Sequence, residues 1–310
     1  MSETSPAPSP EKLAVTDTVP LKHIIMLINP MSGGVGNRAA EEARAILDGY
    51  DIDADIEVLE GDGFDKTIDD AIAAKPDALL VLAGDGTARS VATLAGKNDI
   101  LVATLPGGTM NMLPKALYGT GDWKLALKRV LEEGEPRKVA GGAIGEEYFY
   151  CAAILGAPAL WAPAREAIRS GKMGEALSKA KHAFNRAFSG RIRFSLDGKD
   201  SEKAEALVLI TPLISKSFDE NAPGLEAAAM KTSDAGQALR LAANAVFADW
   251  RNDEAVDIQK SRYVEIWGRS SIPAVIDGET VPVGKSGNVR FVPHAFTALA
   301  LSQDALEDAN

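Results

Sequence analysis

Short aliphatic runs alternate with amphipathic stretches through the first 135 residues of the chain. Four of these runs predict strands, at residues 23–30, 54–59, 78–83 and 99–106. Apolar positions at helical spacing fall between and after them, in residues 37–48, 64–74, 87–95, 110–118 and 122–133. Repeated alternation of strand and helix with short loops predicts an α/β domain built on a doubly wound parallel sheet.

The pattern changes near residue 136, where short strand-like runs separated by turns replace the alternation. These runs are residues 147–155, 191–198, 205–212, 262–268, 273–279 and 288–293. They predict a second domain, a mostly antiparallel β-sandwich, interrupted by helical stretches at about 158–188 and 234–249. We therefore expect four segments: a disordered arm over residues 1–21, the α/β domain over 22–135, the β-sandwich over 136–296 and a C-terminal tail over 297–310.

Composition and charge exclude several classes of protein. The chain has 310 residues, 46% hydrophobic and 25% charged, which is enough to bury the cores of one or two ordinary domains. A formal net charge of −11 argues against a general nucleic-acid-binding protein, because phosphate contacts need an excess of Lys and Arg. No apolar run reaches the roughly 18 residues that span a bilayer, and the first twenty residues lack the basic start and apolar core of a secretory signal. We expect a cytoplasmic protein whose single cysteine, Cys151, is a buried structural thiol.

An acidic residue, Asp85, stands between two glycines where the third aliphatic run ends. Thr87 can cap a following helix, which places Asp85 between the carboxyl end of a strand and the N-terminus of a helix. A plain turn explains a lone Gly-Asp-Gly, because Asp tolerates left-handed backbone and Gly adopts it at no cost. The alternative is an anion site, in which bare backbone amides face the anion while Asp85 holds a cation or takes a proton.

Two further glycine-rich loops favour the anion site, since they follow the first and fourth predicted strands. The three loops are residues 29–37 (NPMSGGVGN), 83–87 (AGDGT) and 105–111 (LPGGTMN). In a parallel sheet all three lie at the carboxyl edge, where open α/β folds bind ligands. Their glycines let backbone amides approach phosphate oxygens, and Ser32, Thr87 and Thr109 add hydroxyl groups. The chain has no GxxxxGK[ST] P-loop, and the first loop lacks the GxGxxG pattern of dinucleotide dehydrogenases.

Together with VIDGE at residues 275–279, the motifs NPMSGG, GDGT and LPGGTMNML resemble the diacylglycerol kinase catalytic family, which includes soluble bacterial lipid kinases, sphingosine kinases and ceramide kinases. The resemblance covers roughly residues 22–295. It implies a nucleotide held between an α/β nucleotide-binding domain and a β-sandwich domain for the lipid substrate. It also implies transfer of the γ-phosphate of ATP to a lipid hydroxyl, with Mg²⁺ neutralising the phosphates.

The resemblance implies roles for individual residues. Asp85 would hold magnesium or its waters, and Glu279 matches the general base that the family is proposed to use on the lipid hydroxyl. Taken alone, Asp277-Gly278-Glu279 also suits a plain hairpin turn. The residues expected to line the ATP site are Asn29, Pro30, Ser32, Gly33, Gly84, Asp85, Gly86, Thr87, Gly107, Thr109 and Asn111.

Four positions depart from the family pattern. Ala83 replaces a glycine, Ser90 stands where a glutamate is usual, and Met112 follows Asn111 in place of an aspartate. The Asp-Gly-x-Leu segment that bacterial members use for a structural magnesium is PGLE here, at residues 223–226, without the aspartate. The ancillary metal site therefore lacks one of its ligands, whereas the catalytic magnesium is still expected.

Two other functions fit parts of the pattern. An NAD kinase or a phosphofructokinase relative also uses a glycine-Asp-glycine turn for ATP, but LPGGTMNML favours the lipid kinases. A non-catalytic lipid-binding module of the same fold would explain Ser90 and Met112, but not the retention of Asp85 and Glu279. We therefore expect an ATP-dependent lipid kinase acting on the primary hydroxyl of a lipid such as diacylglycerol or ceramide. The sequence leaves the choice of lipid, and the formation of a homodimer, open.

One basic stretch contrasts with the acidic chain. Residues 165–193 hold eight basic and two acidic side chains, a local charge of +6 (eight minus two) against −11 overall. Leu177 and Phe184 belong to an apolar stripe at helical spacing, with Lys179, Lys181 and Arg186 elsewhere around the helix. Any surface helix packed on a domain shows such a stripe. The local charge favours a helix beside the lipid entrance that docks transiently on anionic membranes.

Overall fold

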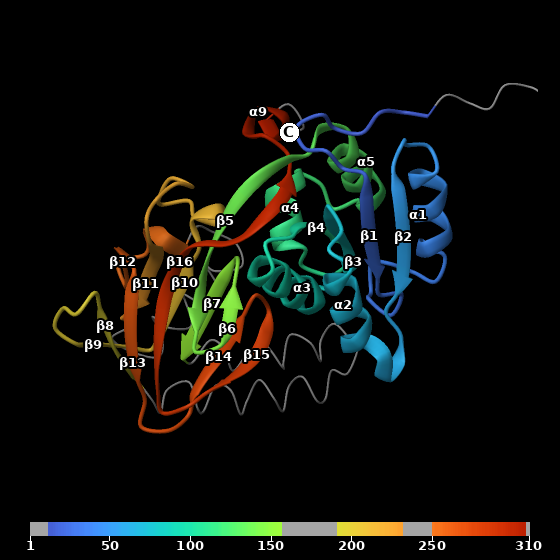
Figure 1. Ribbon diagram of the computed structural model, residues 1–310. Helices are drawn as coiled ribbons and strands as arrows, with labels where there is room; N and C mark the ends of the chain where they lie inside the picture. The colour runs from blue at the N-terminus through green and yellow to red at the C-terminus, as the bar shows by residue number, and fades with distance from the viewer. Residues whose placement is uncertain (1–11, 157–190, 232–249, 308–310) are drawn as a thin grey trace, which may run out of the picture. The chain divides into compact units, whose positions relative to one another are not determined.

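The computed structural model describes residues 12–156, 191–231 and 250–307 (Figure 1). The chain divides into two compact units. The first comprises Met1–Arg137 and Thr297–Asn310, and the second comprises Lys138–Phe296. The helical stretches expected at about 158–188 and 234–249 lie outside the described residues, as does the basic stretch except for Arg191 and Arg193.

Parallel strands form the sheet of the first unit in the order β2-β1-β3-β4. Their bounds are β1 (His23–Ile28), β2 (Asp53–Val58), β3 (Ala78–Ala83) and β4 (Leu101–Pro106). All six residues of β3 are buried, which is why its sequence, ALLVLA, is aliphatic throughout. The C-terminal end of β16 (Ser286–Ala300) adds a parallel pairing to this sheet, with Ala298 opposite Val102.

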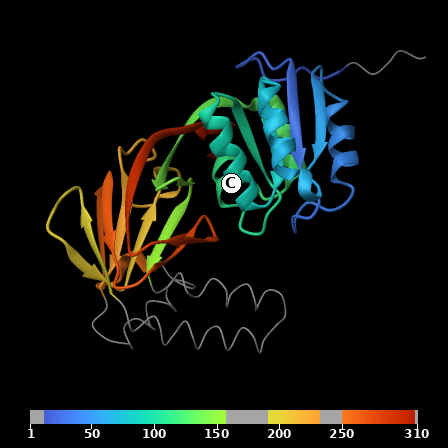
Figure 2. The same ribbon diagram turned by 60° about the horizontal axis from the view of Figure 1, so that its bottom comes forward.

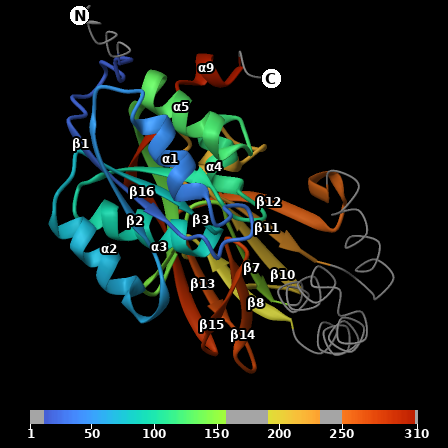
Figure 3. The same cartoon turned by 90° about the vertical axis from the view of Figure 1, so that its right-hand side faces the viewer.

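Helices cover both faces of this sheet (Figure 3). Their bounds are α1 (Ala39–Leu47), α2 (Phe64–Ala73), α3 (Asp85–Lys97), α4 (Met112–Tyr118), α5 (Trp123–Glu133) and the short α9 (Gln303–Glu307). α1 contacts α5 and α2 contacts α3, so the two pairs form separate groups. α3 packs through one face, because its buried residues recur at helical spacing. These residues are Ala88, Val91, Ala92 and Ala95. This arrangement is a doubly wound parallel sheet.

Part of the expected N-terminal arm is folded onto the first unit. Leu13 forms a β-bridge with Tyr50, and the Thr16 hydroxyl donates to the carbonyl of Gly134 at 2.8 Å. Thr16 and Leu21 are buried. The expected disorder is therefore wrong for residues 12–21, because these pairings hold the segment in place. At the other end, residues 297–300 complete β16, so the segment expected as a tail begins inside a strand.

Two antiparallel sheets form the second unit (Figure 2). One has the order β16-β13-β8-β9, with β5 paired to β16 and β6 paired to β5. Its further bounds are β5 (Glu135–Ile144), β6 (Glu147–Phe149), β8 (Ile192–Leu196), β9 (Glu202–Ala204) and β13 (Tyr263–Trp267). The other has the order β12-β11-β10-β7-β14-β15. Its bounds are β7 (Ala152–Gly156), β10 (Ala206–Ile210), β11 (Leu225–Met230), β12 (Val256–Ser261), β14 (Ile272–Ile276) and β15 (Glu279–Val283).

One hydrophobic core joins the inner faces of these two sheets. Phe194 and Ile266 come from one sheet, and Leu155, Leu207 and Ile276 come from the other. This is the packing of a β-sandwich. The predicted fold class, a doubly wound parallel sheet followed by a mostly antiparallel β-sandwich, is confirmed.

The sequence pattern missed some strands and merged others. β5, β9, β11, β12 and β15 were not predicted, since most of their residues are small or polar and form strands only by pairing with neighbours. The run at residues 147–155 is two strands, β6 and β7, separated at Tyr150 and Cys151. Cys151 is buried, as expected.

Candidate functional site

The three glycine-rich loops meet at the carboxyl edge of the parallel sheet, after β1, β3 and β4. Gly84 donates its backbone N–H to the Ser32 hydroxyl oxygen at 2.8 Å, which joins the loop after β1 to the loop after β3. Gly34 donates its backbone N–H to the carbonyl of Gly107 at 3.1 Å, which joins the loop after β1 to the loop after β4. The structure therefore brings the candidate residues of the first unit together.

The loop after β4 folds around Asp85. The Met110 N–H donates to Asp85 Oδ2 at 3.2 Å. Asn111 closes the loop on itself, because its Oδ1 accepts from the Gly108 N–H at 2.8 Å and its Nδ2 donates to the Gly108 carbonyl at 3.0 Å. Asn111 has a left-handed backbone, with φ 50°, so α4 begins at Met112 rather than at residue 110 as expected.

The loop after β4 lies so close to the loop after β3 that only glycine fits at positions 107 and 108. A Cβ atom at Gly107 would lie 2.7 Å from the carbonyl oxygen of Ala83, and one at Gly108 would lie 2.5 Å from Asp85 Oδ2. No larger residue fits between the loops without moving them. A Cβ atom at Gly33 would instead meet nothing within 4 Å, so space lies beside the loop after β1.

The donor groups at this edge fit phosphate oxygens. Asp85 is the first residue of α3 and Gly84 is its N-cap, so the first-turn N–H groups have no partner inside the helix. Residues 84–87 are half-exposed, and the N-terminus of a helix carries partial positive charge. Thr87 is the third residue of α3 and not its cap, because the helix begins two residues earlier than expected.

Asp85 is the carboxylate at this edge that fits a magnesium ion. The part of the chain that the structure describes holds no group of three or more His, Cys, Asp or Glu side chains that could bind a metal by themselves. Mg²⁺ does not need such a cage, because it commonly binds one or two carboxylates and completes its shell with water and substrate phosphates. Asp85 therefore suits a magnesium ion that arrives with a nucleotide.

Glu279, the expected general base, belongs to the second unit. It is the first residue of β15 and pairs with Ile276 across the turn Asp277-Gly278. Both turn residues have positive φ, 48° and 91°, as a two-residue type I′ hairpin requires. The Glu279 side chain is exposed at the start of the strand. The hairpin reading of this motif is therefore correct, while the catalytic role of Glu279 remains a prediction.

Asp277 anchors the hairpin, a role that the sequence analysis did not assign. Its Oδ2 accepts from the Tyr150 N–H at 2.8 Å, and its Oδ1 accepts from the N–H groups of Cys151 and Ala152 at 2.9 Å. These bonds satisfy the backbone where β6 and β7 separate. In the sequence, an aspartate before Gly-Glu predicts only a turn. Its anchoring role is not visible there, because the three N–H donors lie about 125 residues away in the chain.

We expect Asp277→Asn to lower the free energy of unfolding by about 2–4 kcal/mol, because an amide offers one weaker acceptor oxygen to three buried N–H donors. Urea unfolding of the full chain measures this. Glu279→Gln is the matched control at the same turn, and it should change the unfolding free energy by less than about 0.5 kcal/mol because the side chain is exposed. Equal stability of Asp277→Asn and the parent protein would contradict the anchoring role.

Residues 223–226 (PGLE), which lack the aspartate of the family's metal segment, contribute to a buried ion pair instead. Glu226 is 0% exposed, and its Oε1 accepts from Arg251 Nε at 2.7 Å while its Oε2 accepts from the Ser215 hydroxyl at 2.6 Å. A guanidinium therefore neutralises this buried carboxylate. Sequence reasoning missed Arg251, because no local pattern connects this residue of a short 3-10 helix (Trp250–Asn252) to Glu226 on β11.

The other departures do not disturb the loops. Ser90 is an exposed residue of α3, and its hydroxyl donates to the Gly86 carbonyl at 3.1 Å. Met112 is the half-buried first residue of α4. Ser90 on α3 and Met112 at the start of α4 are thus both compatible with the hydrogen-bonded geometry of the loops.

Comparisons with known proteins agree with the motifs. Residues 23–144 match the family model described as the diacylglycerol kinase catalytic domain. A Bacillus anthracis str. Sterne protein provisionally assigned as a diacylglycerol kinase has the same fold, with 17% identity and a TM-score of 0.68 over 92% of this chain and 98% of that chain. A second diacylglycerol kinase structure from the same organism has 18% identity and a TM-score of 0.66 over 90% of this chain and 97% of that chain. No curated protein sequence matches the chain significantly.

Proposed function

We propose that the protein is an ATP-dependent lipid kinase, because residues 23–144 match the model of the diacylglycerol kinase catalytic domain. The transferred group is the γ-phosphate, and the acceptor is the primary hydroxyl of a membrane lipid such as diacylglycerol or ceramide. The observation that carries the proposal is the set of three hydrogen-bonded loops around Asp85, since bare amides and one carboxylate at a sheet edge suit a nucleotide with magnesium.

Each group has a role in the proposed reaction. The amides of the three loops hold the phosphates, Asp85 holds Mg²⁺ or its waters, and Glu279 accepts the proton of the lipid hydroxyl. The hydroxyl oxygen forms a bond to the γ-phosphorus as the bond to the β,γ-bridging oxygen breaks, and ADP leaves. Bound Mg²⁺ supplies charge neutralisation at the phosphates. Because an alcohol is a weak acid, Glu279 needs to act only as the proton leaves.

We further propose that the protein works at the cytoplasmic membrane surface. No helix among the described residues is long and apolar enough to cross a membrane. The support for peripheral contact is the basic stretch at residues 165–193, since each Lys or Arg near an anionic leaflet contributes about 1 kcal/mol of attraction.

Reversing Lys179, Lys181 and Arg186 to Glu should weaken sedimentation with anionic vesicles and lower activity on vesicle-borne lipid, while activity on a short-chain dispersed lipid is retained. A control variant reverses three exposed lysines elsewhere: Lys12, Lys128 and Lys216. It makes the same change in net charge and should leave vesicle binding within about twofold of the parent, since these residues lie outside the basic stretch. Equal effects of the two variants would remove the support for a localised membrane contact.

The substrate is identified by a panel of defined lipids in mixed micelles. Diacylglycerol, ceramide, sphingosine and NAD are each supplied with labelled ATP and magnesium, and products are identified by mass spectrometry. We expect one of the primary-alcohol lipids, diacylglycerol or ceramide, to be phosphorylated at least about tenfold faster than NAD. Phosphorylation of NAD alone would favour the small-molecule kinase alternative, and the absence of any ATP turnover would favour a lipid-binding module.

A further inference from the structure

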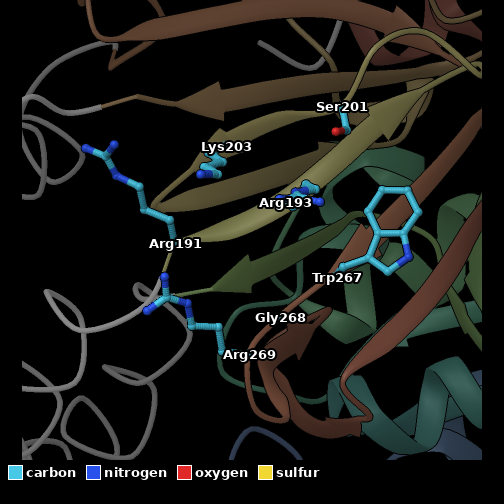
Figure 4. A pocket seen from close by; sticks show the side chains of 7 residues that line it. All are labelled: Arg191, Arg193, Ser201, Lys203, Trp267, Gly268 and Arg269. Atoms are coloured by element: carbon cyan, nitrogen blue, oxygen red, sulfur yellow. The ribbon is translucent and has the colours of Figure 1, made fainter.

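A cationic pocket lies in the second unit. Its volume is about 490 Å³, and four basic side chains line it together with Trp267: Arg191, Arg193, Lys203 and Arg269. Figure 4 shows these side chains: Arg193, Lys203 and Trp267 lie on β8, β9 and β13, while Arg191 immediately precedes β8 and Arg269 follows β13. Pockets for small ligands commonly have volumes of about 300–1,000 Å³. The proposed reaction uses none of these residues.

Strand register places two of the cations directly opposite each other. Arg193 on β8 pairs with Lys203 on β9 and, on its other side, with Trp267 on β13. Directly paired residues point to the same face of a sheet. Arg193 is exposed while its neighbours Ile192 and Phe194 are buried, so this row lies on the outer face. Like charges directly opposite each other destabilise a sheet. The Arg193–Lys203 pair therefore lowers the stability of the fold rather than supporting it.

Among the described residues, one of the four cations has a carboxylate within ion-pair distance. Arg191 forms an ion pair with Glu205 at 2.6 Å. In residues 12–156, 191–231 and 250–307, no carboxylate lies within ion-pair distance of Arg193, Lys203 or Arg269. On the other side of the row from Glu205, the next acidic position in the register is Glu265, which pairs with Ser195. In the described part of the chain, three positive charges of the pocket thus have no ion-pair partner.

The end of β13 is held by a tight turn. The Gly268 N–H donates to the Lys285 carbonyl at 2.7 Å, and a Cβ atom at Gly268 would lie 2.8 Å from the Ser270 carbonyl oxygen. Only glycine fits this turn, which fixes Trp267 and Arg269 on either side of it. A pocket whose cations are carried by paired strands and a fixed turn loses little backbone freedom when it binds a ligand.

The pocket is separate from the Glu279 hairpin. β14 runs from Ile272, beside Gly268, to Ile276, which precedes the Asp277-Gly278 turn. Four steps of about 3.3 Å each, from Ile272 to Ile276, put roughly 13 Å of strand between the two ends. The pocket and Glu279 therefore lie at opposite ends of the same strand.

We propose that this pocket binds the phosphate group of an anionic ligand. Guanidinium groups bind phosphate oxygens through two hydrogen bonds, and Lys203 adds a compact positive charge. Trp267 supplies an apolar wall beside the charged group. The group is a phosphate mono- or diester, carried either by a lipid headgroup or by a small molecule in solution. The inference does not depend on the proposed kinase activity.

Binding is tested on the full chain without ATP. Inorganic phosphate is titrated while tryptophan fluorescence is recorded, and vesicles of phosphatidylcholine with phosphatidic acid are tested by sedimentation against vesicles of phosphatidylcholine alone. The test variant is Arg193→Gln with Lys203→Gln. The control is Lys216→Gln with Arg262→Gln, which removes the same charge from exposed positions outside the pocket. Trp267→Phe identifies the part of the fluorescence signal that comes from the pocket.

We expect the test variant to bind at least about tenfold more weakly than the control, in the phosphate titration or in the vesicle assay. Loss in the phosphate titration identifies a soluble ligand, and loss only with phosphatidic acid vesicles identifies a lipid headgroup. The test variant should also melt at the same or a higher temperature than the parent without ligand, because the Arg193–Lys203 repulsion is gone; a merely structural role predicts a lower melting temperature. Binding by neither probe, or equal binding by test and control variants, would overturn the proposal.

Discussion

Replacing Asp85 with Asn is expected to lower phosphate transfer at least about a hundredfold, and replacing Glu279 with Gln is expected to do the same. Asn keeps the shape of Asp85 and an acceptor for the Met110 N–H, but it removes the charge that would hold magnesium in the proposed reaction. Gln keeps the shape of Glu279 but cannot accept the proton of the lipid hydroxyl. Both variants should fold, because Glu279 is exposed and Asp85 is half-exposed at the start of α3.

Steady-state rates at saturating ATP and lipid measure these effects, and the dependence on magnesium separates the two roles. Asp85→Asn should need a higher magnesium concentration for half-maximal rate, whereas Glu279→Gln should leave that concentration unchanged. Ser90→Ala is the control on α3, since Ser90 only donates to the Gly86 carbonyl on the exposed face of the helix. If both carboxylate variants kept near-normal rates, the assigned roles would be wrong.

Replacing Arg251 with Met is expected to lower the free energy of unfolding by about 3–5 kcal/mol, because it leaves the carboxylate of Glu226 buried without its counter-charge. Glu226 is 0% exposed, and the side chain of Arg251 is 13% exposed. Removing the hydroxyl with Ser215→Ala should cost less, about 1 kcal/mol, because the ion pair remains.

The double variant Arg251→Met with Glu226→Leu is the control for this effect. It removes both charges together, and replacing a buried ion pair with apolar groups of similar volume is often close to neutral. We therefore expect urea unfolding to show recovery of most of the lost stability in the double variant. A double variant as unstable as Arg251→Met alone would mean that packing of the arginine, and not its charge, supports the second unit.

The candidate site of the first unit followed from local sequence pattern and one rule of topology. Aliphatic runs such as residues 78–83 identified the strands, and the carboxyl ends of parallel strands meet at one edge. The loops containing Ser32, Asp85 and Asn111 were therefore expected to lie together, and the hydrogen bonds between the loops confirm it. What the pattern could not supply was the exact start of helices, such as α3 at Asp85.

In the second unit the sequence was less informative, because the interactions that organise it connect residues far apart in the chain. The Asp277 carboxylate binds the backbone of residues 150–152, and Arg251 binds Glu226, yet neither pair leaves a periodic signal. The Arg193–Lys203 pair depends on the register of two strands, which the alternation of residues does not specify. The sequence analysis therefore counted Arg193 in the basic stretch but could not place Lys203 opposite it.

The measurement that tests the central claim most directly is transfer of labelled γ-phosphate from ATP to an unfractionated lipid extract by the purified full chain. The proposed function predicts a labelled phosphomonoester lipid in the organic phase, one ADP for each lipid phosphorylated, and at least about a hundredfold less product with Asp85→Asn. Label found in NAD, or ADP formed without any labelled lipid, would contradict the proposal that this protein is a lipid kinase.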